Sequence, residues 1–356
     1  MATVTLSQMS RWYGRYRAVH PLDLVIHDGE SLTFCGPSGC GKSTVLRLIA
    51  GLIVPSSGSI ALDGRVVSSS RGIAPLKDRG MALLFQSIAL WPHMTVAENV
   101  GYGLRQRAMP APEIASRIDA ALEAAGLAKA ASIYPRQLSP EAQQRAALAR
   151  AVAVRPRVLL LDDALATVPA PARQRLATDI RGLARRIGLT LISVTGDIAE
   201  ALTLSDRIAV MNRGRIEQVD TPGALYMRPE TKHVATEMGP ALLLAGTRKG
   251  NRIHLPGATI DVGQVRDGTG PAGPLTICLR PEHLAILPAD SPMPPGQVAI
   301  AGRVRERTFA GTTWTYAVIP DTGGPDIIVF APNTTVLGAG ASVLLAIDPQ
   351  LVCIVR

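Results

Sequence analysis

The segment GPSGCGKST at residues 36–44 limits the possible folds of this chain more than any other feature. It fits the phosphate-loop pattern G-x-x-x-x-G-K-[ST], and it lies between a predicted strand at residues 31–35 and a predicted helix at residues 42–50. In such a loop, backbone N–H groups converge on phosphates at a helix N-terminus, where the helix dipole favours an anion. We expect the nucleotide to be contacted by Gly36, Pro37, Ser38, Gly39, Cys40, Gly41, Lys42, Ser43 and Thr44.

Two residues of this loop have predicted chemical roles. Lys42 is expected to reach the β- and γ-phosphates, and the Ser43 hydroxyl is expected to coordinate Mg²⁺. A glycine-rich turn with no nucleotide role would not need a Lys-Ser pair at this position. Cys40 is interpreted as a small buried residue rather than a reactive thiol.

A second motif, VLLLDD at residues 158–163, is a buried strand that runs into two carboxylates. Alone, this motif is weak evidence for a magnesium site, because buried strands also end in acids that act as solvated caps. Downstream of a phosphate loop, it predicts that Asp162 holds Mg²⁺ through water. Asp163 then stands where a base for the attacking water is expected.

Short β-like runs at residues 31–35, 158–161 and 189–194 alternate with helical patterns, which predicts βαβ units and a largely parallel sheet. Between about residues 94 and 150 the strand signal disappears, which indicates an inserted helical subdomain. A hairpin turn is expected at residues 212–214, and a linker follows residue 226. We therefore predict an α/β domain at residues 1–238 and an all-β domain, a small barrel or sandwich, at residues 239–356.

Composition narrows the functional classes. The 356 residues carry a formal net charge of +9, nearly all of it before residue 240. Nucleic acid binding is disfavoured, because there is no dense Lys/Arg run and only 4% of the residues are aromatic. Four cysteines without CxxC spacing and a first segment without an apolar core predict a cytoplasmic protein. No apolar stretch approaches the roughly 20 residues that span a bilayer, so partner chains would have to anchor it at a membrane.

Several further motifs resemble the ABC ATPase family, in particular the ATP-binding subunits of importers for maltose, iron(III) and polyamines. Tyr13 in RWYGRYRAV matches the aromatic residue that stacks on adenine, and Gln86 matches the glutamine that senses Mg²⁺ and the attacking water and contacts the membrane subunit. LSPEAQQRAALARAV at residues 138–152 occupies the place of the LSGGQ signature, where Ser139 would contact nucleotide on the opposite subunit. LRPEHLAI at residues 279–286 resembles a motif of the C-terminal regulatory domain.

The resemblance implies a P-loop NTPase (ABC ATPase) core of α/β class with a helical subdomain, followed by an OB-like regulatory domain. It implies ATP and Mg²⁺ as cofactors, with Asp163 and Gln86 as catalytic residues and Ser43, Gln86 and Asp162 around the metal. Expected partners are a second ATP-binding subunit, membrane-spanning permease subunits and, indirectly, a solute-binding protein. The expected location is peripheral, at the cytoplasmic face of the bacterial inner membrane.

The signature segment departs from the family pattern. Pro140 has no N–H, Glu141 brings a negative charge, and Ala142 replaces the glutamine. The same residues also form a self-sufficient helix start, with Ser139 as N-cap, a proline at the first position and an acid against the dipole. Both interpretations predict a helix end that is poorly suited to receive an anion.

Three further positions differ around the expected water site. The catalytic glutamate of the family is Asp163, the expected histidine is Gly196, and the aspartate that couples the two sites is Pro169. The sequence thus predicts an importer ATPase with weakened hydrolysis. The alternative is a non-hydrolysing nucleotide-binding regulatory subunit paired with an intact ATPase chain.

Overall fold

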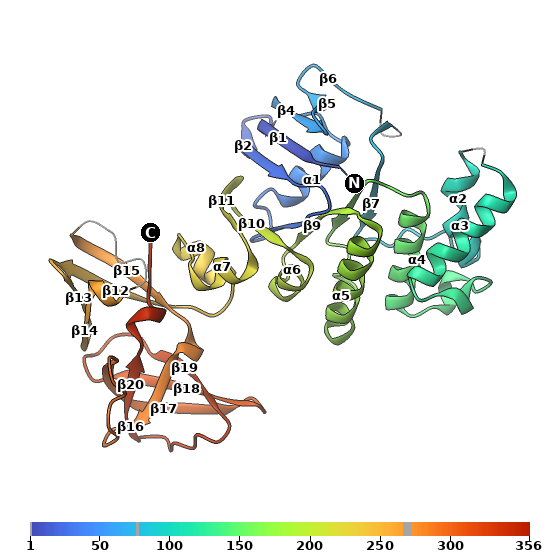
Figure 1. Ribbon diagram of the computed structural model, residues 1–356. Coiled ribbons are helices and arrows are strands. Elements are labelled where there is room, and N and C mark those ends of the chain that lie inside the picture. Colours follow the sequence, from blue (N-terminus) through green and yellow to red (C-terminus); the bar gives the residue numbers. More distant parts are fainter. Residues whose placement is uncertain (1, 76–77, 108, 266–271) are drawn as a thin grey trace. The chain divides into compact units, whose positions relative to one another are not determined.

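The computed structural model of the protein describes residues 2–75, 78–107, 109–265 and 272–356. They separate into two compact units, Met1–Pro222 and Gly223–Arg356, here called unit 1 and unit 2 (Figure 1). No helix in the described part of the chain combines the length and the apolar character that crossing a membrane requires.

The central sheet of unit 1 has the strand order β11-β10-β3-β9-β8-β7. Its neighbours from β10 to β7 are parallel, and β11 returns antiparallel to β10 through the hairpin turn predicted at residues 212–214. The strands are β3 (Ser31–Cys35), β7 (Met81–Phe85), β8 (Val158–Asp162), β9 (Thr190–Thr195), β10 (Arg207–Asn212) and β11 (Arg215–Asp220).

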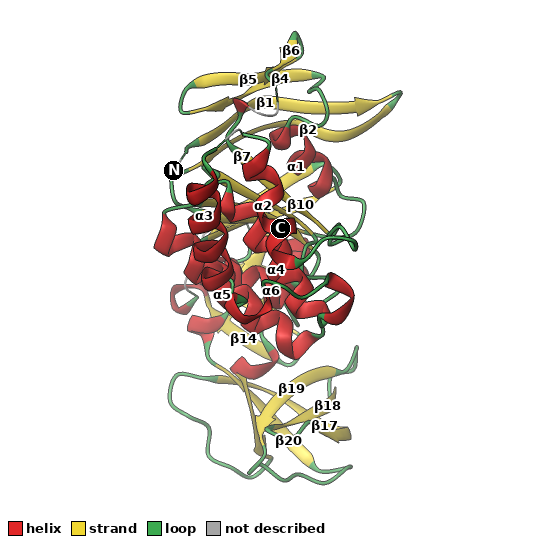
Figure 2. Ribbon diagram, turned by 90° about the vertical axis from the view of Figure 1, so that its right-hand side faces the viewer, coloured by secondary structure: helices red, strands yellow, loops and turns green. Residues whose placement is uncertain are grey.

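A second, antiparallel sheet of unit 1 has the order β2-β1-β4-β5-β6. Figure 2 shows it at the top of the view, apart from the cluster of helices. Its strands are β1 (Val4–Tyr13), β2 (Tyr16–Ile26), β4 (Ser57–Leu62), β5 (Arg65–Ser69) and β6 (Gly72–Ile73).

The helices of unit 1 fall into two groups. Helix α1 (Lys42–Ala50) packs against β8 and β9 and contacts β2, while α5 (Ala170–Ile187) packs against α6 (Ile198–Leu204). Helices α2 (Val96–Arg105), α3 (Ala111–Ala124) and α4 (Pro140–Ala153) pack on one another and lie together in Figure 1. Their residues nearly coincide with the range of about 94–150 predicted as a helical subdomain. Short 3₁₀ turns at Ala128–Ala130 and Pro135–Gln137 connect α3 and α4.

The sequence of the central strands explains where the site lies. Every residue of β3, β8 and β9 is buried, as expected for parallel strands covered on both faces. Cys35 lies opposite Thr195, and Asp162 lies opposite both Val194 and Phe85. The carboxyl ends of these strands therefore meet at one edge, where open parallel sheets bind ligands.

Unit 2 contains two five-stranded antiparallel sheets, β14-β13-β12-β15-β21 and β16-β20-β17-β18-β19. Both contribute to one apolar core around the fully buried Tyr316. Its elements are α7 (Pro222–Met227), α8 (Lys232–Glu237), β12 (Leu242–Lys249), β13 (Arg252–Leu255), β14 (Ala258–Asp261), β15 (Gly273–Leu279), β16 (Leu284–Pro288), β17 (Val298–Phe309), β18 (Thr313–Pro320), β19 (Ile327–Pro332), β20 (Ser342–Ile347) and β21 (Cys353–Val355), with 3₁₀ turns at Val262–Gln264, Pro281–His283 and Pro349–Leu351.

The division between Pro222 and Gly223 lies earlier than the boundary predicted between residues 238 and 239. The segment read as a linker starts at the last residue of α7, contains α8 and belongs to unit 2. Proline, glycine and charge in that segment indicated a break in the α/β pattern, but they could not show which unit the segment joins.

The buried Arg280 explains why this segment joins unit 2. Its guanidinium donates hydrogen bonds to the carbonyls of Ala235 at 2.8 Å, Pro240 at 2.9 Å and Tyr226 at 2.9 Å. It also lies 4.0 Å above the centre of the Tyr226 ring. One side chain of the β domain thus holds the ends of both short helices.

Replacing Arg280 with Ala should lower the free energy of unfolding of unit 2 by about 3 kcal/mol, because buried carbonyls lose charged donors. The exposed Arg252→Ala on β13 serves as the control and should change it by less than about 0.5 kcal/mol. Urea unfolding followed by circular dichroism measures both variants. Equal stabilities of the two variants would contradict this account of the division.

Candidate nucleotide-binding site

The phosphate loop joins β3 to α1 and depends on close backbone contacts at two glycines. Gly36 has φ 149°, and a Cβ there would lie 2.2 Å from the Met211 carbonyl oxygen. Gly41 has φ 108°, and a Cβ there would lie 2.6 Å from the Ala18 carbonyl oxygen. Only glycine fits at both positions, so the loop is held between the end of β10 and strand β2.

Lys42, the first residue of α1, is held against the loop itself. Its side chain is buried, and Nζ donates to the carbonyl oxygens of Gly36 at 2.6 Å and Pro37 at 3.0 Å. Cys40 is also buried, with Sγ 3.9 Å from Nζ. The ammonium group therefore lies against the carbonyls of the phosphate loop.

Two clefts meet at Ser43 and Asp163. The first, of about 490 Å³, is lined by Ser43, Arg47, Phe85, Gln86, Ser87, Asp162, Asp163 and Thr167. The second, of about 260 Å³, is lined by Tyr13, Tyr16, Ala18, Ser38, Gly39, Gly41, Lys42, Ser43, Thr44 and Asp163. The structure thus brings together Tyr13 at the end of β1, the phosphate loop before α1, Gln86 after β7, and both carboxylates at the end of β8.

The two carboxylates differ in their surroundings. Asp162 is buried at the end of β8 and forms an ion pair with Arg47, with Nε 3.6 Å from Oδ2. Asp163 has φ 48°, and its backbone N–H donates to the Val194 carbonyl. Burial raises the pKa of Asp163; the Lys42 ammonium and the Gly196 N–H oppose this shift, and the Asp162 carboxylate adds to it. Sequence reasoning missed Arg47, whose helical position alone did not indicate its partner.

Gly196 stands between β9 and α6, where the family resemblance implies a histidine. A Cβ at this position would meet no other atom within 4 Å, and the residue does not have a positive φ. Packing therefore does not require glycine here. The surroundings of this position would leave room for a side chain.

Glu200, on the first turns of α6, was also missed by sequence reasoning. It is only 3% exposed, and its Oε1 atom has no hydrogen-bond partner among the described residues. Burial raises its pKa to about 8, and the charge of Asp197 adds to the shift; the hydrogen bond with Thr195 and the charge of Arg173 oppose it. Glu200 is therefore largely a neutral acid at pH 7, close to the edge that carries Asp163.

Arg173 ties two loops of the site together. It forms an ion pair with Asp197, the N-cap of α6, and donates to the carbonyl of Val168 at 3.0 Å. Val168 belongs to the ATVP segment that ends at Pro169. The segment after the second carboxylate is thus fastened to the beginning of α6.

Ser139 directly precedes α4, and neither cleft includes it among its described lining residues. It caps α4, because its hydroxyl accepts a hydrogen bond from the Ala142 N–H at 3.2 Å. Pro140 occupies the first turn, and Glu141 pairs with Arg145 at 3.0 Å. The predicted self-sufficient helix start is confirmed, because the Ala142 N–H and the Glu141 carboxylate both have partners within the chain.

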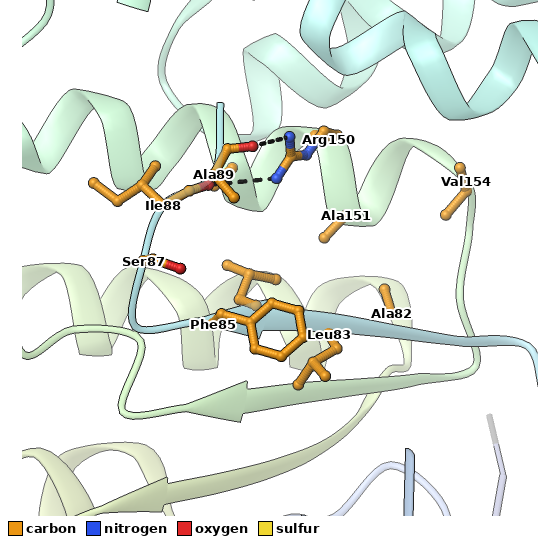
Figure 3. A pocket seen from close by; sticks show the side chains of 11 residues that line it. Ala82, Leu83, Phe85, Ser87, Ile88, Ala89, Arg150, Ala151 and Val154 are labelled. Carbon is orange, nitrogen blue, oxygen red and sulfur yellow. Dashed lines mark hydrogen bonds between the residues drawn. The ribbon is translucent and has the colours of Figure 1, made fainter. Parts of the chain in front are cut away.

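A third cavity, of about 200 Å³, lies beside the turn after β7 (Figure 3). Its lining includes Phe85, Ser87 and Ala89 from the end of β7 and the turn after it, and Arg150 of α4. Arg150 donates to the carbonyl of Ala89 at 2.7 Å and lies 4.9 Å above the centre of the Trp91 ring. The segment that begins at Gln86 is thereby fixed against the helical subdomain.

The raised pKa of Glu200 predicts a pH effect on stability. In the folded state Glu200 keeps a proton that the same carboxyl releases above its ordinary pKa of 4.5 in the unfolded chain. The contribution of Glu200 to the free energy of unfolding therefore falls as the pH rises from about 5 to 8. Glu200→Gln removes this titration. Calorimetry of unit 1 should show the variant gaining thermal stability relative to wild type as the pH rises through this window, whereas the exposed Glu123→Gln should not. A pH-independent difference between wild type and Glu200→Gln would refute the assignment.

Comparison with known proteins agrees with this geometry. Residues 19–166 match the family model described as ABC transporter, and residues 277–354 match the TOBE domain. The spermidine/putrescine import ATP-binding protein PotA of Thermobifida fusca is 40% identical, over 93% of this chain and 87% of that protein. The Fe(3+) ions import ATP-binding protein FbpC of Vibrio cholerae is 40% identical, over 80% of each.

A solved structure extends the likeness to three dimensions. The dimeric structure of a post-hydrolysis state of an ATP-binding cassette, bound to ADP and Pi, has a TM-score of 0.54 and 30% identity, over 61% of this chain and 98% of that chain. The predicted α/β ATPase core and the OB-like C-terminal domain are confirmed. The chain therefore belongs to the ABC transporter family of ATP-binding proteins, among relatives that are named import ATP-binding proteins.

Proposed function

We propose that this protein binds Mg²⁺-ATP at the phosphate loop and works as the ATP-binding subunit of a bacterial solute importer. The observation that carries the proposal is the meeting of two clefts at Ser43 and Asp163, one holding the loop and Tyr13, the other Gln86 and Asp162. Backbone N–H groups and Lys42 would bind the phosphates, and Tyr13 would stack on the base.

The residues of the larger cleft suit Mg²⁺. A hydroxyl from Ser43, an amide oxygen from Gln86 and a carboxylate from Asp162 are oxygen donors, which Mg²⁺ prefers together with substrate phosphates. The ion pair between Asp162 and Arg47 indicates that this buried carboxylate attracts a cation. When bound, Mg²⁺ would neutralise charge on the phosphates. Asp163 and Gln86 would orient the attacking water.

The proposed partners are a second ATP-binding subunit and membrane-spanning permease subunits. A dimer would place Ser139 of one subunit near the nucleotide of the other, in line with the dimeric form of the related cassette. The segment from Gln86 to Asn99, which Arg150 contacts at Ala89 and Trp91 beside the cavity of Figure 3, is the surface proposed to contact the permease. A solute-binding protein would act through the permease, and the subunit would be peripheral to the cytoplasmic face of the membrane.

Hydrolysis is proposed to be weak. At the start of α4, Pro140 has no N–H and Glu141 brings a negative charge, and Gly196 supplies no side chain to position water. A second candidate function is that of a regulatory subunit that binds nucleotide beside an intact ATPase chain. The self-capped start of α4 favours this function as much as it favours a weakly hydrolysing importer subunit.

Lys42→Ala should abolish measurable Mg²⁺-ATP binding, because the cation that faces the β- and γ-phosphates is lost. Lys129→Ala, an exposed lysine outside the phosphate loop, should bind ATP as the wild type does. Isothermal titration calorimetry on the purified chain measures both. An unchanged dissociation constant for Lys42→Ala would remove the basis of the phosphate-loop assignment.

Restoring the missing chemistry should distinguish the two candidates. One set, Gly196→His with Asp163→Glu, repairs the water-positioning groups beside the chain's own nucleotide. The other, Pro140→Gly with Glu141→Gly and Ala142→Gln, repairs the surface offered to the opposite subunit. In a homodimer the combined gain in ATPase rate should exceed the product of the separate gains, since each remaining defect limits the same transition state.

In a heterodimer the two sets act on different sites. Their effects on the steady-state ATPase rate should then be nearly independent, and the second set should give the larger gain. A wild-type rate of about 1 s⁻¹ or more, typical of enzymes, would show that these substitutions do not impair catalysis.

A further inference from the structure

The tip of the β1–β2 hairpin is unusually aromatic. Aromatic residues make up 4% of the chain, yet three of the five residues from Trp12 to Tyr16 are aromatic. All three are exposed, with Tyr13 46% and Tyr16 62% accessible. Large exposed rings beside a cleft commonly mark a binding surface.

The strand register places Tyr13 and Tyr16 side by side. They are directly opposite each other across the turn of Gly14 and Arg15, where Gly14 has φ 57°. Side chains that face each other in an antiparallel pair lie on the same face, with Cβ atoms about 4.5–5.5 Å apart. Tyr16 also shares its face with Ala18, two residues along β2. All three residues line the cleft that contains the phosphate loop.

Arginines fix the aromatic rings of the hairpin. The Arg11 guanidinium lies 4.7 Å from the centre of the Tyr13 ring and forms a cation–π contact with it. Arg17 lies 4.0 Å from the centre of the Trp12 ring, and neither of these two residues lines the phosphate-loop cleft. Tyr16 is therefore the second aromatic residue that this hairpin presents to the cleft.

We propose that Tyr16 and Tyr13 together form a platform for the nucleobase, and that Tyr16 makes the site selective for purine nucleotides. Two neighbouring rings can both be covered by the fused rings of a purine, whereas a pyrimidine overlaps only one of them. The inference rests on the proposed ATP site and concerns the end of the cleft away from the phosphates.

The test compares ligands that share phosphates but differ in the base. Dissociation constants of the full-length chain for ATP, CTP and inorganic tripolyphosphate are measured with Mg²⁺ by isothermal titration calorimetry. Tyr16→Ala should weaken ATP binding about three- to tenfold, the value of one aromatic contact. It should weaken CTP binding less than about twofold and leave tripolyphosphate binding unchanged. Tyr16→Phe should retain ATP affinity, and the exposed Tyr134→Ala should behave as the wild type.

The outcomes separate this inference from the proposed function. Retained ATP binding in Lys42→Ala overturns the phosphate site itself. If Lys42→Ala loses ATP while Tyr16→Ala keeps the wild-type ratio of ATP to CTP affinity, the purine platform is wrong. An equal weakening of all three ligands in Tyr16→Ala also overturns it, because that pattern indicates a structural effect on the loop.

Discussion

The parallel pairing of β3, β9 and β8 determines where every chemical group of the site stands. These strands are buried along their whole length, so their register is fixed by packing on both faces. Because Cys35 aligns with Thr195 and Asp162 with Val194, the phosphate loop, the carboxylates and the turn at Gly196 emerge at one edge. A slip of register would separate them, whatever their local sequences.

Around this edge, the loops are joined by their own polar groups. Lys42 bonds to carbonyls of the phosphate loop, Arg173 joins the ATVP segment to the start of α6, and Ser139 caps its own helix. Such bonds stabilise the loops without a ligand. For Lys42 a phosphate offers charged acceptors in place of neutral carbonyls, which are stronger partners. For Ser139 the Ala142 N–H is already satisfied, so an incoming anion gains less.

Features encoded by short segments could be predicted from the sequence. The strand, loop and helix around Gly36 to Thr44, the strand that ends in Asp162 and the turn at residues 212–214 depend on local patterns, and the structure contains all three. Arg47 and Arg280 could not be predicted, because their partners are distant in sequence, and Glu200 could not, because its raised pKa comes chiefly from burial. The structure divides the chain earlier than the predicted boundary for a similar reason. A linker composition does not reveal an arginine over forty residues later that binds its carbonyls.

The neutral carboxyl of Glu200 has a consequence for how a polyanion approaches. A triphosphate arriving at this edge already faces the negative charges of Asp162 and Asp163. An ionised Glu200 would add Coulomb repulsion in a poorly screened interior. Because Glu200 retains its proton, this edge of the sheet carries less negative charge than the number of its acidic residues suggests. Ionisation of Glu200 would therefore add one more negative charge near the edge that a phosphate approaches.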